Sequence, residues 1–172
     1  MGITKYFKIK EDITIENRPK ILGFKSSFTK AEYIDKDNNM LYVKSTGTYI
    51  DYTDYLDKTL LLTSDMFKEV VKIYHKDYIY KTVALREEDE PNIRVYWNIE
   101  MPDENKCLSN LTTFNHDGTL NKIVIDEKKA DGLCMLRLKN KLWNIYVVRL
   151  DMAESLLRRG LLGFTLEELE HN

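Results

Sequence analysis

The sequence predicts an α+β fold, with a largely antiparallel sheet or sheets and two main helices at about residues 64–75 and 151–159. Three observations lead to this prediction. Short β-prone runs recur along the chain and are separated by turn residues, which is typical of strands joined by hairpins. Two segments have the 3.6-residue apolar period of an amphipathic helix. The strand–helix–strand rhythm of a parallel sheet is absent from the sequence.

The bulk composition limits the classes of protein. A chain of 172 residues has the length of one domain, so we expect a single domain over residues 1–172 with a strand-rich part at 1–58. Charged residues make up 31% of the chain and the formal net charge is −2. A nucleic-acid-binding protein would need a basic stripe, and a membrane helix would need ~18 consecutive apolar residues. We therefore expect a cytoplasmic protein that binds neither nucleic acid nor membrane.

The first third of the chain predicts short strands with loops. Weak alternation of apolar and polar residues marks 5–9 and 13–15. An apolar run covers 20–24, and a β-prone run covers 40–44. Runs of this kind, bounded by turn residues, are typical of strands, so we expect a strand in each.

Helical periodicity first occurs in the stretch "DMFKEVVKIYH". Its apolar residues recur at helical spacing between Met66 and Tyr74, and lysines and a glutamate take the other side. Thr63 or Ser64 precedes the stretch and can cap a helix. We therefore expect the first helix to run from about Ser64 to His75.

The middle of the chain predicts hairpins. The runs "YIYKTVAL" and "IRVYWNIEM" are rich in β-branched and aromatic residues, and they flank the acidic turn "EEDEPN". Asp117-Gly118 lies between two further β-prone runs, and this dipeptide favours a tight hairpin turn. The runs "LCMLRL" and "LWNIYVV" are joined by the polar turn "KNK" and should form another pair of strands.

In the last part of the chain the sequence predicts a second helix, which an apolar segment follows. In "DMAESLLRRG" the apolar residues share one face, and Gly160 stands where a helix C′ stop belongs. The segment that follows has two interpretations. Leu162, Phe164 and Leu166 alternate as in a strand, whereas "TLEE" is also a helix capping box. We favour a strand through Leu166.

Residues that could bind a metal or perform catalysis are scattered along the chain. His75, His116 and His171 have no second histidine or cysteine at i+3 or i+4, so we expect no metal site. Cys107 and Cys134 suit neither a disulfide framework nor a zinc knuckle. Phosphate-binding loops, nucleophile elbows and dinucleotide fingerprints are absent. We therefore expect no cofactor, and an enzyme only if its active site is assembled from distant positions.

One segment interleaves tyrosines and aspartates, each at a step of three. In this tyrosine–aspartate stretch, "YIDYTDYLD", the residues are Tyr49, Asp51, Tyr52, Asp54, Tyr55 and Asp57. The structural interpretation packs tyrosines against the core and leaves the aspartates in solvent. The functional interpretation uses the tyrosines as contact area and the carboxylates as complements to a basic partner.

The turn between the two predicted strands of the middle region is a second candidate. This acidic run consists of Glu87, Glu88, Asp89 and Glu90. A solvated loop is the commoner explanation of such a run. The alternative is that the run contributes to the same partner-binding surface as the tyrosine–aspartate stretch.

The order of elements from Leu60 onward resembles a known family. "LLLTSDMFKEVVKIY" is followed by paired strands and then by "LWNIYVVRLDMAESLLRRGLLGFTLEELE". Over roughly residues 60–170, this order and ending are similar to a family of bacterial immunity proteins from polymorphic-toxin loci. The resemblance implies a cytoplasmic protein that binds and neutralises a cognate toxin. It carries no binding residues across to this chain.

The leading hypothesis is therefore an immunity protein that occludes the active surface of a cognate toxin domain with a basic surface. Self-association stays open. The alternatives are a small-molecule enzyme with a dispersed active site and an accessory protein of a mobile element that mediates assembly.

Overall fold

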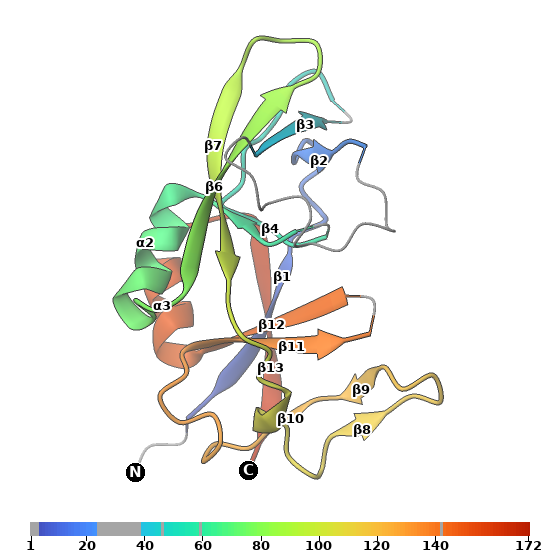
Figure 1. Ribbon diagram of the computed structural model, residues 1–172, viewed down its shortest axis with the longest axis vertical. Coiled ribbons are helices and arrows are strands. Elements are labelled where there is room, and N and C mark those ends of the chain that lie inside the picture. The colour runs from blue at the N-terminus through green and yellow to red at the C-terminus, as the bar shows by residue number, and fades with distance from the viewer. Residues whose placement is uncertain (1–3, 24–38, 46, 59, 142) are drawn as a thin grey trace.

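The computed structural model describes residues 4–23, 39–45, 47–58, 60–141 and 143–172. Over these ranges the protein has an α+β fold with two α-helices and mixed, mainly antiparallel sheets, as the sequence predicts (Figure 1). Two larger sheets, called sheet A and sheet B below, contain most of the strands.

Sheet A has five strands in the order β10-β13-β1-β12-β11. Their bounds are β1 Tyr6–Glu11, β10 Val124–Ile125, β11 Met135–Asn140, β12 Trp143–Arg149 and β13 Phe164–His171. The strand β1 pairs antiparallel with both β12 and β13. The first strand of the chain is therefore central in a sheet whose other strands come from the last third.

Sheet B has six strands in the order β2-β3-β6-β7-β5-β4. Their bounds are β2 Lys20–Ile21, β3 Met40–Lys44, β4 Tyr55–Leu56, β5 Leu62–Thr63, β6 Ile79–Glu87 and β7 Ile93–Glu100. The strands β6 and β7 form the predicted antiparallel hairpin with the acidic run at its tip. Figure 1 shows this hairpin extending beyond α2 at one end of the molecule.

The remaining elements are a short hairpin and a 3₁₀ turn. The strands β8 (Thr113–Phe114) and β9 (Leu120–Lys122) pair antiparallel, and η1 spans Asn105–Cys107. The hairpin turn contains Asp117 and Gly118, whose φ of +78° is in the region that favours glycine. The predicted Asp-Gly turn is confirmed.

Both helices begin and end where local chemistry favours it. The helix α2 spans Asp65–Tyr74, and Ser64 Oγ accepts the N–H of Phe67 at 3.2 Å, as predicted for a cap. The helix α3 spans Leu150–Arg158 and is followed by Gly160 with φ +69°. Figure 1 shows the two helices side by side on one flank. No helix among the described residues is long and apolar enough to cross a membrane.

The segment predicted as a strand at residues 13–15 forms a turn. Asp12 Oδ1 accepts both the N–H of Thr14 at 2.9 Å and its hydroxyl at 2.7 Å. This side chain competes with strand pairing by binding the backbone two residues later. The predicted strand at 20–24 is shorter, since β2 ends at Ile21, and Phe24 lies outside the described residues.

The strand at the end of the chain is longer than predicted. We expected it to end at Leu166, but β13 continues to His171. It lies between β1 and β10, pairing antiparallel with the first and parallel with the second. Pairing with β1 as far as Leu169, and with β10 at Glu170 and His171, holds the segment in an extended conformation, which a capping box cannot offset.

Sheet A has buried apolar residues on both faces. On one face Ile9, Tyr146 and Val148 join a core shared with the two helices. On the other face Tyr6 and Val147 join a second core that includes residues from the loops around η1. Sheet B adds a third apolar cluster, so that sheet A is the central layer of the molecule.

His75, directly after α2, joins that helix to sheet A. Its Nε2 accepts the backbone N–H of both Cys134 and Met135 at 3.0 Å, and its ring stacks on Tyr78 at 4.3 Å. Burial, and secondly the Arg149 cation, lower the pKa of His75. The imidazole is therefore neutral and acts as a hydrogen-bond acceptor between two elements.

We expect His75 to make the fold sensitive to mild acid. Because its pKa in the folded protein lies below the ordinary 6.5, its stabilisation is complete above that pH and is lost as the pH falls from 6.5 toward the folded pKa. Urea unfolding of the wild type should show a slope of up to about 1.4 kcal/mol per pH unit in this window. His75→Gln, which does not titrate, should show a flatter profile. Equal slopes in the two proteins would contradict the assignment.

Candidate functional site

The tyrosine–aspartate stretch divides into a surface half and a buried half. Tyr49 is 62% exposed, Asp51 is exposed and Tyr52 is half-buried. Tyr55 has no exposed surface and packs edge-on to Phe164, with 6.2 Å between ring centroids. Tyr55 is therefore a core residue and is not part of the candidate surface.

Asp54 holds the loop that follows α3. The N–H of Leu162 donates to Asp54 Oδ2 at 2.8 Å, and the N–H of Asp54 donates to the Leu162 carbonyl at 2.9 Å. Gly163 has a φ of +95°, and a Cβ at this position would lie 2.4 Å from the Cβ of Thr53. The ending "LLGF" that contributes to the family resemblance therefore packs directly against the tyrosine–aspartate stretch. Asp54 stabilises this contact through its two hydrogen bonds with Leu162.

Asp57 belongs to a buried polar cluster at the end of β1. Glu11 Oε1 accepts Nε of Arg18 at 2.8 Å, and Glu11 Oε2 accepts the N–H of Asp57 at 3.1 Å and of Lys58 at 3.3 Å. The side chains of Arg18 and Glu11 are 9% and 5% exposed. Because β1 belongs to sheet A, and Asp57 follows β4 of sheet B, the cluster joins the two sheets.

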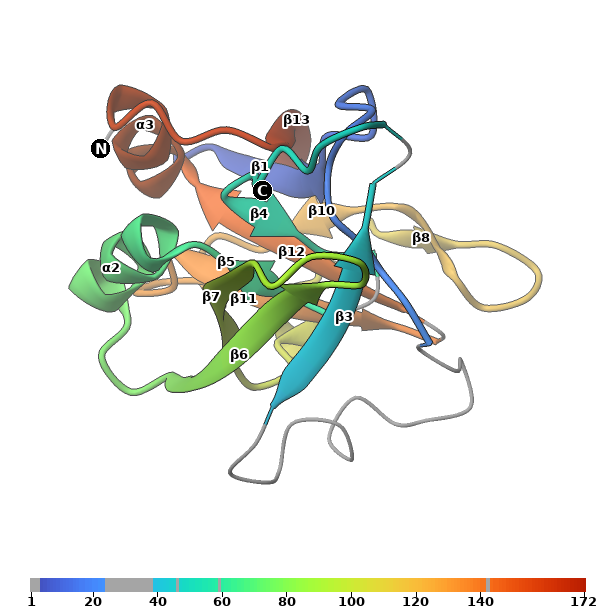
Figure 2. The same ribbon diagram turned by 90° about the horizontal axis from the view of Figure 1, so that it is seen from above.

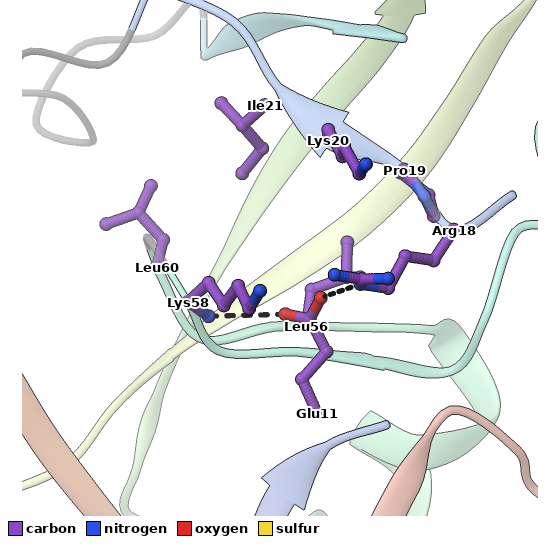
Figure 3. Close-up of a pocket in the computed structure, with 8 residues that line it drawn as sticks. All are labelled: Glu11, Arg18, Pro19, Lys20, Ile21, Leu56, Lys58 and Leu60. Carbon is purple, nitrogen blue, oxygen red and sulfur yellow. Dashed lines mark hydrogen bonds and ion pairs between the residues drawn. The ribbon is translucent and has the colours of Figure 1, made fainter. Parts of the chain in front are cut away.

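This polar cluster lies in the wall of a pocket between the sheets (Figure 3). The pocket has a volume of about 220 Å³ and is lined by Glu11, Arg18, Pro19, Lys20, Ile21, Leu56, Lys58 and Leu60. Figure 3 shows the Arg18 guanidinium directed at the Glu11 carboxylate. Both oxygens of that carboxylate have protein partners, so Glu11 is not a free general acid or base. We assign the cluster a structural role.

The structure brings His75 and Cys134 together, but not as a catalytic pair. Nε2 of His75 is occupied by two backbone N–H groups, so it is not free to take the thiol proton. Burial raises the pKa of Cys134 to about 11, and an activated thiolate needs a lowered pKa. Among the described residues no group of three His, Cys, Asp or Glu side chains could hold a metal ion.

The surface half of the stretch meets the acidic run at one end of sheet B. The hydroxyl of Tyr52 donates to Glu87 Oε1 at 3.0 Å, across 35 positions of sequence. The Arg94 guanidinium lies 5.4 Å from the centre of the Tyr52 ring. Burial and the bond to Glu87 raise the pKa of Tyr52 to about 12, so the phenol keeps its proton and remains the donor.

The rest of the acidic run is the tip of the β6–β7 hairpin. Glu88, Asp89 and Glu90 are exposed there, and we call these three residues the acidic tip. In the described part of the chain they have no ion-pair partner. The two segments singled out in the sequence thus contribute to one surface through Tyr49, Asp51, Tyr52, Glu87 and the acidic tip.

Beside the acidic tip, sheet B exposes apolar side chains on one face. On this outer face of sheet B, four apolar side chains are 38–55% exposed: Met40, Tyr42, Ile93 and Val95. The strand register aligns Met40 with Ala84 and Val95, and Tyr42 with Arg86 and Ile93. Residues aligned in this way project from the same side of a sheet, so the four lie on β3 and β7 of one face, with Ala84 and the exposed Arg86 of β6 between them.

The helix α2 covers this side of sheet B only at the end away from the tip. Nζ of Lys68 lies 3.8 Å from the centre of the Trp97 ring, and Trp97 is two residues beyond Val95 on the same face. Figure 2 shows α2 on the β7 side of the hairpin, away from β3. The tip half of the face has no covering element among the described residues.

Sequence reasoning missed the outer face. The run "IRVYWNIEM" alternates, but alternation does not say how far along a strand the covering element reaches. Element length offers a signal. A helix of 10 residues spans about 15 Å, whereas the 9 residues of β6 span about 30 Å. The first helix is therefore too short to cover the whole hairpin.

The comparisons with known proteins assign no residues. No protein-family model matches the chain, and a search of curated proteins finds no match. The candidate surface therefore rests on the geometry of sheet B.

Removing the charge of Glu11 should destabilise the fold strongly. Glu11→Gln leaves Arg18 buried without a counter-ion, which costs about 3–5 kcal/mol of the free energy of unfolding. Lys10→Gln is the matched control, because its ion pair with Glu167 is exposed and contributes about 1 kcal/mol or less. Urea denaturation measures both variants. A smaller effect for Glu11→Gln than for Lys10→Gln would refute the role of the cluster.

The two ends of the tyrosine–aspartate stretch should respond differently to truncation. Tyr55→Ala removes a fully buried ring and should lower the free energy of unfolding by about 3–5 kcal/mol. Tyr49→Ala should change it by about 0.5 kcal/mol or less, since its ring is mostly in solvent. Thermal and urea unfolding test the pair, and similar losses in both would show that the division is wrong.

Proposed function

We propose that this protein is a binding protein of the toxin-immunity class, which holds a basic protein partner at the tip end of sheet B and covers that partner's active surface. The observation that carries the proposal is the Tyr52–Glu87 hydrogen bond of 3.0 Å, which joins the tyrosine–aspartate stretch to the acidic run. The resemblance over residues 60–170 supports the immunity class.

The composition of this end suits a protein partner. Specific interfaces have an apolar centre with aromatic residues and a polar rim. Here Tyr42, Ile93 and Val95 supply exposed apolar area, and the acidic tip lies at its border. Tyrosines such as Tyr49 bury a large area at a low entropic cost. The combination favours a macromolecular surface over a small ligand.

The charges favour a basic partner. The three carboxylates of the acidic tip are exposed and have no ion-pair partner among the described residues, and Asp51 adds a fourth exposed carboxylate at the same end. Unpaired carboxylates accelerate association with a cation-rich surface. The Arg94 guanidinium at this end lies beside the Tyr52 ring. In this proposal the protein acts in the cytoplasm by steric occlusion, without cofactor or catalytic step.

The proposal predicts that a large secreted protein is encoded next to this gene, and the test begins with that protein. Its C-terminal domain should arrest growth when expressed alone in the cytoplasm, and co-expression of the present protein should restore growth. The purified domain is then the probe for binding. Absence of both rescue and binding would refute the proposed function.

Charge reversal of the acidic tip should act on association. A variant with Glu88→Lys, Asp89→Lys and Glu90→Lys should bind the domain roughly tenfold more slowly at low salt. The difference should shrink at high salt, because ions screen exposed charges. Asp131→Lys, at an exposed position between β10 and β11 of sheet A, is the control and should leave the rate unchanged. Equal association rates for the tip variant and the wild type would exclude the tip from the interface.

A further inference from the structure

One edge of strand β7 pairs with β6, and the opposite edge is paired with another strand over only part of its length. On the second edge, β5 pairs with Trp97 and Asn98, and α2 begins two residues after β5 ends. In the described part of the chain, no strand pairs with Ile93, Arg94 or Val95 on this side. All three residues are exposed.

The direction of the backbone groups in β7 follows from the bonds around it. The N–H of Glu87 donates to the Asn92 carbonyl at 3.1 Å, which marks a hydrogen-bonded pair of the antiparallel ladder. Alternation then directs the N–H and C=O groups of the odd-numbered residues of β7 away from β6. The N–H of Ala84, the register partner of Val95, agrees with this, because it donates to Asn39 on the β3 side at 2.8 Å.

The outward-directed groups belong to Ile93 and Val95, whose side chains also lie on the outer face of sheet B. A strand added at this edge would therefore gain main-chain hydrogen bonds and apolar contact from the same two residues. This combination is the basis of recognition by strand addition.

We propose that β7 accepts an extended strand of the partner protein along Ile93–Val95, so that sheet B continues into the partner. This inference rests on the proposed function and names the way in which the partner is held. The added strand is short, because β5 occupies the edge from Trp97 onward.

Arg94 determines which strand fits. Its side chain lies on the opposite face from Ile93 and Val95, beside the Tyr52 ring. In an antiparallel pair centred on Arg94, a second copy of this chain would place two arginines directly opposite each other, which is destabilising. An acidic residue at that position is stabilising. The partner strand thus has a central acidic residue, apolar residues on both sides of it, and basic residues where it passes the acidic tip.

Val95→Pro tests the main-chain contact. Proline removes the N–H of position 95, which has no partner in β6, so the internal ladder of the hairpin is retained. Val95→Ala removes most of the side chain but keeps the N–H, and it is the matched control. Against the toxin domain defined by growth rescue, Val95→Pro should weaken affinity about tenfold or more, and Val95→Ala distinctly less. Equal losses in the two variants would overturn strand addition.

Hydrogen exchange provides a readout that does not depend on how a variant folds. In the free wild-type protein the N–H groups of Ile93 and Val95 should exchange quickly, and those of Arg94 and Tyr96 slowly. Binding of the toxin domain should protect Ile93 and Val95. Slow exchange at these two positions in the free protein, or no protection in the complex, overturns the inference.

The outcomes separate the two proposals. If the toxin domain binds the wild type but leaves Ile93 and Val95 unprotected, the proposed function stands and strand addition fails. If the domain neither binds nor is neutralised, both fail. If the free protein is a dimer that Val95→Pro dissociates, the edge is occupied by a second copy, and the assignment to a partner strand is overturned.

Discussion

The buried Glu11 carboxylate is the contact on which the arrangement of the two sheets depends. It ends the central strand of sheet A and binds Arg18, which precedes β2, and the main chain after β4 of sheet B. A buried charge is tolerated only where it is paired and its lone pairs are filled, and here both oxygens are occupied. These contacts join the end of β1 in sheet A to the segments beside the two outer strands of sheet B, β2 and β4.

Carboxylates that bind main-chain groups also explain why the tyrosine–aspartate stretch has a structural half and a surface half. From Thr53 onward the stretch follows the inter-sheet boundary, where Asp54 and Asp57 bind main-chain groups and Tyr55 fills the core. Before that point the chain passes over the tip end of sheet B, where Tyr49 is in solvent. Asp54 and Asp57 are structural here because their carboxylates accept main-chain N–H groups of other segments. Among the described residues, the ending "LLGF" contacts the structural half and not the surface half.

The sequence predicts the parts of this structure that local chemistry determines. The Ser64 cap, the Asp117-Gly118 turn and the Gly160 stop each depend on neighbours within a few residues, and all three are present. The candidate site depends on contacts between distant segments. Tyr49 and Tyr55 share a residue type and a periodic pattern, yet one is exposed and the other is buried. Which tyrosine meets Phe164, and how far α2 reaches along the hairpin, is decided by tertiary packing that no periodicity encodes.

The way in which the two sheets cover their edges bears on the role of the sheet B surface. Proteins usually block free edges, because unpaired backbone groups recruit other strands. Sheet A follows this rule. Its edge strand β11 is covered by residues 103–105, where the main-chain N–H of Glu104 donates to the Arg137 carbonyl at 2.8 Å and Asn105 Oδ1 accepts the N–H of Lys139 at 2.7 Å. Along the tip half of β7 no described segment does the same. Among the described residues, the protein covers the edge of sheet A and leaves the tip half of β7 unpaired beside carboxylates that have no ion-pair partner. This arrangement suits the proposed strand from a basic partner, with Arg94 disfavouring a second copy of the chain.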